Sequence, residues 1–245
     1  MTYQESTWCG FRRLDFEFEG YPAILVLPKA PNAARRLAMK TEYFGAFPAT
    51  EIAMLEAGYH LCYIKNRSRW ATDDDTDRKA HLIDFLADEF GTARKVVTVG
   101  MSAGGFQSIA LAARYPEYIS FLYLDAPVIT FFSVGNDLLE SMVKKIRWPE
   151  IQKAYGFHSF AEAYCYPKQP ANHLPFLAER RLPVGLVYGG QDEAAPPAFN
   201  AEIIKDLYET TGAPIRTWYR PLYGHHPHGL ENPAELLAYI EEVAL

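Results

Sequence analysis

Residues 96–105 read Val-Val-Thr-Val-Gly-Met-Ser-Ala-Gly-Gly, and they carry the strongest structural signal in the chain. A short β-branched run leads into Gly-x-Ser-x-Gly, and the small and apolar residues of 103–114 predict a helix directly after it. In this context the motif is typical of a sharp turn that holds a serine hydroxyl above a sheet. Gly100 and Gly104 are expected because a side chain at either position would collide with neighbouring backbone. Ser102 is therefore the candidate nucleophile.

The same alternation of short apolar runs and helical patterns extends in both directions from this turn. Eight strands are expected, at 14–18, 23–27, 36–44, 59–65, 96–100, 119–124, 184–188 and 215–220. Helices are expected at 51–57, 75–90, 103–114, 198–210 and 234–243. The first two strands are expected to pair antiparallel around a turn at 20–22. The rhythm as a whole predicts an α/β protein with a mostly parallel eight-stranded sheet and helices on both faces.

The predicted organisation is a single domain over residues 1–245. Residues 128–181 interrupt the β/α rhythm with helical and irregular sequence, and the rhythm then resumes. This segment is therefore expected to be a short helical cap inserted into the domain rather than a second domain.

Composition excludes several classes of function. The 24 basic and 30 acidic residues give a net charge of −6, which argues against broad binding to nucleic acid. No apolar run approaches about 18 residues, so no membrane span is expected. The first 20 residues contain no apolar signal core. The three cysteines, Cys9, Cys62 and Cys165, form no C-x-x-C pair, so reduced thiols and a cytoplasmic location are expected.

A serine nucleophile needs a base, and the base needs an acid that orients it. In a parallel sheet both partners are expected just after the carboxyl ends of later strands. Asp192 follows the strand predicted at 184–188 and is the preferred acid, with Glu193 and Asp125 as alternatives.

The base is expected in the Gly-His-His-Pro-His loop at 224–228, which follows the strand predicted at 215–220. His225 comes first after the strand and is preferred. His226 precedes a proline, which biases it to extended backbone and makes it the alternative base, while His228 is the third choice. Three histidines in four residues also suggest a metal site, but Pro227 prevents a helical ligand spacing, and no metal is expected.

Four segments together resemble the α/β-hydrolase fold family, and the resemblance covers nearly the whole chain. They are GMSAGG at 100–105, AARYPE at 112–117, VYGGQDEAAP at 187–196 and YGHHPHGLENP at 223–233. The resemblance implies Ser102 as nucleophile, Asp192 as acid and His225 as base.

One oxyanion donor is expected from the sequence itself, the Ala103 N–H at the start of the predicted helix. The resemblance implies a second donor from the Tyr43–Phe47 loop, the N–H of Phe44 or Gly45. Phe44 stands where many lipases of the family carry histidine.

The expected activity is that of a serine esterase, which hydrolyses a small-molecule ester through an acyl-enzyme without a cofactor. Amide, peptide and thioester hydrolysis stay open, because one triad serves all of these reactions. A non-catalytic ligand-binding receptor with the same fold is the alternative from a different class. Five aromatic residues near the predicted strand ends are expected to line the substrate pocket: Trp70, Phe106, Phe131, Phe132 and Tyr223.

Overall fold

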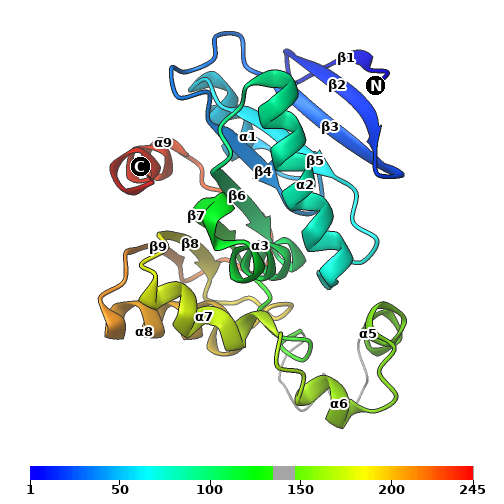
Figure 1. Cartoon of the computed structure of the whole chain (residues 1–245). Helices are drawn as coiled ribbons and strands as arrows, with labels where there is room; N and C mark the ends of the chain where they lie inside the picture. Colours follow the sequence, from blue (N-terminus) through cyan, green and yellow to red (C-terminus); the bar gives the residue numbers. More distant parts are fainter. Residues whose placement is uncertain (135–146, 245) are drawn as a thin grey trace.

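A twisted sheet forms the centre of the molecule in a computed structural model that describes residues 1–134 and 147–244 (Figure 1). The strands are β1 (Gln4–Trp8), β2 (Phe11–Phe18), β3 (Tyr21–Leu27), β4 (Leu37–Lys40), β5 (His60–Ile64), β6 (Val96–Met101), β7 (Ile119–Asp125), β8 (Val184–Gly189) and β9 (Ile215–Arg220). The α-helices are α1 (Ala49–Glu56), α2 (Asp73–Phe90), α3 (Ala103–Arg114), α5 (Trp148–Tyr155), α6 (Phe160–Tyr164), α7 (Pro170–Glu179), α8 (Ala201–Thr211) and α9 (Ala234–Val243).

The sheet has the order β1-β2-β3-β5-β4-β6-β7-β8-β9 among the described residues. The pairs β1–β2, β2–β3 and β3–β5 are antiparallel, and every pair from β5 to β9 is parallel. The predicted fold class is confirmed, with nine strands in place of eight. The sequence analysis missed β1 because its residues, Gln-Glu-Ser-Thr-Trp, are mostly polar and exposed and show no apolar alternation.

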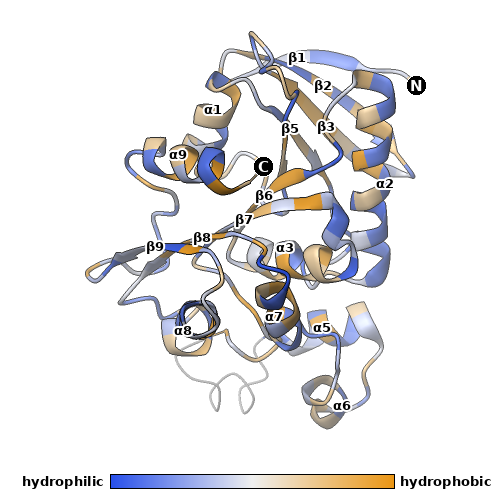
Figure 2. Ribbon diagram, turned by 60° about the vertical axis from the view of Figure 1, so that its left-hand side comes forward, coloured by the Kyte–Doolittle hydropathy of each residue, from blue (hydrophilic) through white to orange (hydrophobic). Residues whose placement is uncertain are grey.

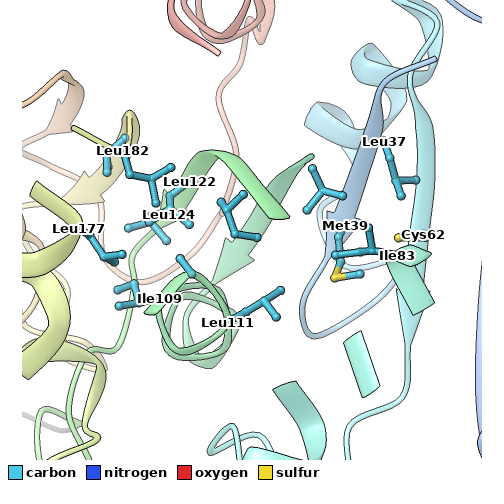
Figure 3. Packing of buried hydrophobic residues seen from close by; sticks show 14 of the residues in the cluster. Leu37, Met39, Cys62, Ile83, Ile109, Leu111, Leu122, Leu124, Leu177 and Leu182 are labelled. Carbon is cyan, nitrogen blue, oxygen red and sulfur yellow. The ribbon is translucent and has the colours of Figure 1, made fainter. Parts of the chain in front are cut away.

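Helices cover both faces of the sheet. Apolar side chains of α2, α3, α7 and α8 pack on one face in a single large cluster, and those of α1 and α9 pack on the other. Figure 3 shows part of the larger cluster, in which Ile83 and Ile109 face strand residues such as Met39 and Leu122. The inner strands β6 and β8 are buried along their whole length, and the hydropathy colours of Figure 2 follow this pattern. Burial on both faces explains their continuous apolar sequence.

The expected insertion at 128–181 divides into parts with different packing. Residues 135–146 lie outside the described residues. Helices α5 and α6 extend away from the sheet (Figure 1) and build a separate aromatic cluster with Trp70, Phe106 and Phe131. Helix α7, in contrast, packs against α3 and α8 and contributes Leu174 and Leu177 to the main core. The end of the expected cap is therefore part of the layer that covers the sheet.

The helices carry no candidate for a membrane crossing. Over the described residues, none combines the length and the apolar character that a bilayer span requires.

Candidate active site

Ser102 lies on the turn between β6 and α3, where the sequence analysis expected it. Its backbone has φ 52° and ψ −119°, a conformation that non-glycine residues rarely adopt. The Ser102 N–H donates to the Asp125 carbonyl and the Ser102 carbonyl accepts from the Gly105 and Val128 N–H groups. These hydrogen bonds hold the strained turn from both sides and keep the hydroxyl at the carboxyl edge of the sheet.

Two glycines make this turn sterically possible. A Cβ on Gly100 would lie 2.5 Å from Ser108 Oγ and 2.6 Å from the Gly104 carbonyl oxygen. A Cβ on Gly105 would lie 2.4 Å from Pro127 Cβ. At Gly104 the nearest atom would be a side-chain oxygen 3.2 Å away, so the contact is looser than the expected backbone collision. The requirement for glycine is therefore strongest at Gly100 and at Gly105, which the sequence analysis had not singled out.

A chain of hydrogen bonds joins Ser102 to the preferred base and acid. His225 Nε2 lies 3.0 Å from Ser102 Oγ, and His225 Nδ1 lies 2.7 Å from Asp192 Oδ2. The other carboxylate oxygen of Asp192 accepts from the Ala194 N–H at 2.9 Å and the Ala195 N–H at 2.7 Å. Because Asp192 accepts at Nδ1, the neutral imidazole carries its proton there and offers Nε2 as acceptor to the serine hydroxyl.

The alternatives for acid and base lie in different surroundings. Glu193 is exposed, whereas Asp192 is 4% exposed. The ring of His226 stacks on Phe47 with centroids 5.5 Å apart. Burial, followed by the charges of His228 and His225, lowers the pKa of His226. Neither alternative makes a hydrogen bond to Ser102.

Asp125 and His228, two further alternatives for the triad, form a pair of their own. His228 Nδ1 lies 2.9 Å from Asp125 Oδ1. Asp125 Oδ2 accepts from the Gly229 N–H at 2.5 Å and from the Tyr123 hydroxyl at 3.1 Å. This pair was not predicted from the sequence, in which each residue is only an alternative member of the triad. A signal was present, since both residues follow strands that end at the same edge of the sheet.

A cavity of about 440 Å³ opens over Ser102. Its lining residues come from the nucleophile turn, the loop after β4, the insertion and the loop after β9: Tyr43, Ala46, Phe47, Arg69, Trp70, Met101, Ser102, Ala103, Val128, Val134, Arg147, Ala194, His225, His226 and His228. The surface is mainly apolar, and its charged or polar residues are two arginines, three histidines, Tyr43 and Ser102. A cavity of this size suits a small organic substrate.

Of the five aromatic residues expected around the pocket, Trp70 lines it and the other four do not. Phe106, Phe131 and Phe132 are at most 3% exposed and pack in the cluster behind Trp70. The Trp70 ring meets Phe106 at 90° with centroids 5.5 Å apart. The Tyr223 hydroxyl instead donates to Glu231. The phenylalanines thus form the support of the cavity wall rather than its surface.

The expected oxyanion donors also differ in where they lie. Ala103 lines the cavity and begins α3, so its N–H has no acceptor within its own helix. Phe44 packs away from the cavity, with its ring 5.1 Å from Trp8 and 5.5 Å from Tyr63. From the same loop, the residues that line the cavity are Tyr43, Ala46 and Phe47.

A buried ion pair lies beneath the nucleophile turn. Lys40, the last residue of β4, pairs with Glu51, and the Lys40 ammonium also lies 3.2 Å from Met101 Sδ. Burial raises the pKa of Glu51, and the negative charge of Asp125 acts in the same direction. Met101 precedes Ser102 directly, so this pair supports the floor of the cavity.

The three histidines of the loop are the nearest approach to a metal site among the described residues. One potential ligand atom from each of His225, His226 and His228 lies within 4.8 Å of the others. However, His225 uses both ring nitrogens in hydrogen bonds to Ser102 and Asp192. A metal bound by all three would have to displace one of those bonds, so the arrangement favours the serine chemistry.

Comparison with known proteins defines the fold. No family model and no curated protein sequence matches the chain. Acetyl xylan esterase 1 from Thermoanaerobacterium is similar in structure, with a TM-score of 0.65 and 17% identity over 100% of this chain and 88% of the other. A bacterial membrane phospholipase A is also similar, with a TM-score of 0.62 and 17% identity over 96% of this chain and 87% of the other.

A peptidase has a similar structure as well. The acylaminoacyl peptidase of Pyrococcus horikoshii is similar in structure, with a TM-score of 0.63 and 13% identity. The match covers 92% of this chain but only 38% of the peptidase. All three are α/β-hydrolase fold proteins, and so the chain described here has the α/β-hydrolase fold.

Proposed function

We propose that the protein is a serine hydrolase that cleaves a small-molecule carboxylic ester through an acyl-enzyme intermediate. The observation that carries the proposal is the continuous hydrogen-bonded chain from Ser102 through His225 to Asp192 at the wall of a cavity. Similarity to an esterase and a phospholipase supports hydrolase chemistry on this fold.

In the first half-reaction, Ser102 Oγ forms a bond to the ester carbonyl carbon while His225 Nε2 takes the hydroxyl proton. The carbonyl oxygen becomes an oxyanion, which the Ala103 N–H stabilises together with a backbone N–H of the loop after β4. The resemblance implied Phe44 or Gly45 for that second donor, but the residues of this loop that line the cavity are Tyr43, Ala46 and Phe47. The carbon–oxygen bond to the alcohol then breaks, and His225 gives its proton to the leaving oxygen.

In the second half-reaction, water attacks the acyl carbon and His225 takes a proton from that water. The bond to Ser102 Oγ breaks, the serine recovers its proton and the carboxylic acid leaves. Asp192 keeps the His225 ring in one orientation and stabilises its positive charge, and two backbone N–H groups hold Asp192 in turn.

The test is Ser102→Ala on p-nitrophenyl butyrate. We expect kcat to fall by at least about 10⁴-fold with an unchanged fold, because the nucleophile is lost while the turn is retained. Ser120→Ala is the matched control, since that hydroxyl donates to the Val96 carbonyl at 3.1 Å and does not line the cavity. Retained hydrolysis in Ser102→Ala contradicts the proposal.

Two further measurements separate the alternatives. A fluorophosphonate probe labels an activated serine, so a non-catalytic receptor would stay unlabelled. Butyryl p-nitroanilide has the same acyl group as the ester, and a kcat/KM equal to that of the ester would favour the peptidase-like alternative.

A further inference from the structure

We propose that His228 is a substrate-binding residue of this cavity and that it binds a hydroxyl group on the alcohol side of the ester. This proposal rests on the proposed ester hydrolysis. It starts from the buried Asp125–His228 pair, which the triad mechanism does not use.

The position of the His228 ring is strongly constrained. Its side chain is 4% exposed and that of Asp125 is 0% exposed. Asp125 holds His228 Nδ1 with one oxygen, and the Gly229 N–H and the Tyr123 hydroxyl hold the other oxygen. An ionisable pair is costly to bury, and each of these hydrogen bonds offsets part of that cost. The result is an imidazole with one orientation.

The second nitrogen of this ring is left for a ligand. Within residues 1–134 and 147–244, no side chain or backbone group makes a hydrogen bond to His228 Nε2. His228 lines the same cavity as Ser102. With Nδ1–H donated to Asp125, neutral His228 offers a lone pair at Nε2, and protonated His228 offers N–H. A hydroxyl group can donate or accept, so it suits both forms.

The place of His228 indicates which side of the substrate it contacts. His225 must return its proton to the leaving oxygen, so the alcohol passes close to the His225 ring. The His228 ring lies beside it, with centroids 4.8 Å apart and planes at 78°. A hydroxyl on a carbon near the leaving oxygen would therefore come within reach of His228 Nε2.

A structural role alone makes a different prediction. If His228 only anchored its loop to Asp125, then Nδ1 would be the one nitrogen that matters. The side-chain amide of asparagine reaches the position of Nδ1, and that of glutamine reaches the position of Nε2. The two substitutions therefore separate the anchoring role from the substrate-binding role.

The experiment compares 2-hydroxyethyl butyrate with propyl butyrate, which have the same acyl group and similar size. We expect the wild type to prefer the hydroxyethyl ester by about tenfold in kcat/KM, the effect of one hydrogen bond in a desolvated site. His228→Asn should lose this preference, and His228→Gln should keep most of it. His81→Asn, at a histidine 56% exposed on α2, is the control that should change neither rate.

Two outcomes would overturn the proposal. One is a wild type that hydrolyses both esters through Ser102 without preference. The other is a His228→Asn variant that keeps the wild-type preference, which would leave His228 with the anchoring role only. If the wild type hydrolyses p-nitrophenyl butyrate but neither of these two esters, the proposed ester hydrolysis stands and this inference fails; if it hydrolyses none of the three, both fail.

Discussion

Two histidine–aspartate pairs lie side by side in this molecule, and they differ in what the second ring nitrogen meets. In both pairs Nδ1 contacts a buried carboxylate, at 2.7 Å for His225–Asp192 and 2.9 Å for His228–Asp125. His225 Nε2 faces a serine hydroxyl on a strained turn, whereas His228 lines the cavity and its Nε2 has no hydrogen-bond partner among the described residues. A carboxylate contacts Nδ1 in each pair, so the neighbour of Nε2 determines the chemistry that each pair can perform.

The largest expected effect tests which histidine is the general base. His225→Ala should lower kcat on p-nitrophenyl butyrate by about 10⁵-fold, as expected for loss of a general base in a triad. His226→Ala should lower it by no more than about threefold, because His226 stacks on Phe47 and makes no hydrogen bond to Ser102. Steady-state kinetics measure both, and equal mild losses would mean that neither histidine is the base.

The two carboxylates provide a smaller contrast. Asp192→Asn should lower kcat by about 10⁴-fold, because an amide at this position favours the wrong tautomer of His225. Asp125→Asn should lower kcat by no more than about tenfold, since its histidine takes no proton from Ser102. A larger loss in Asp125→Asn than in Asp192→Asn would reverse the assignment of the two pairs.

The free energy of unfolding should depend more on Asp125 than on Asp192, which is the opposite of the order expected for kcat. Asp125→Ala leaves three buried donors without an acceptor and should lower the free energy of unfolding by about 3 kcal/mol. Asp192→Ala should cost about 1–2 kcal/mol, because two of its three partners, His225 and Ala194, are only partly buried and water can replace part of the interaction. Urea denaturation followed by circular dichroism compares the two, and a smaller loss in Asp125→Ala would contradict the structural weight assigned to that pair.

Local sequence patterns predicted most of the fold. The helices at 103–114 and 234–243 and the strand at 215–220 have the expected bounds. In the two helices the apolar residues occupy the positions that are buried, so a local pattern contained the information. Strand β1 was missed because its pairing with β2 uses backbone hydrogen bonds and requires no apolar residues. The expected cap includes residues 170–179 because they break the strand–helix rhythm, and in the structure α7 packs on the core.

For the candidate site, the sequence alone determined the strained serine turn and the order in which acid and histidine loops follow it. Both depend on short-range features, namely small residues at a tight turn and polar residues just after buried strands. Only the tertiary structure decided which histidine meets Ser102, which aromatic ring reaches the cavity, and that Asp125 and His228 form a second pair. Asp125 and His228 are separated by 103 residues, and their contact depends on where β7 and β9 end in space. The sequence places both residues after the ends of strands, but the packing of the whole sheet decides whether their side chains meet.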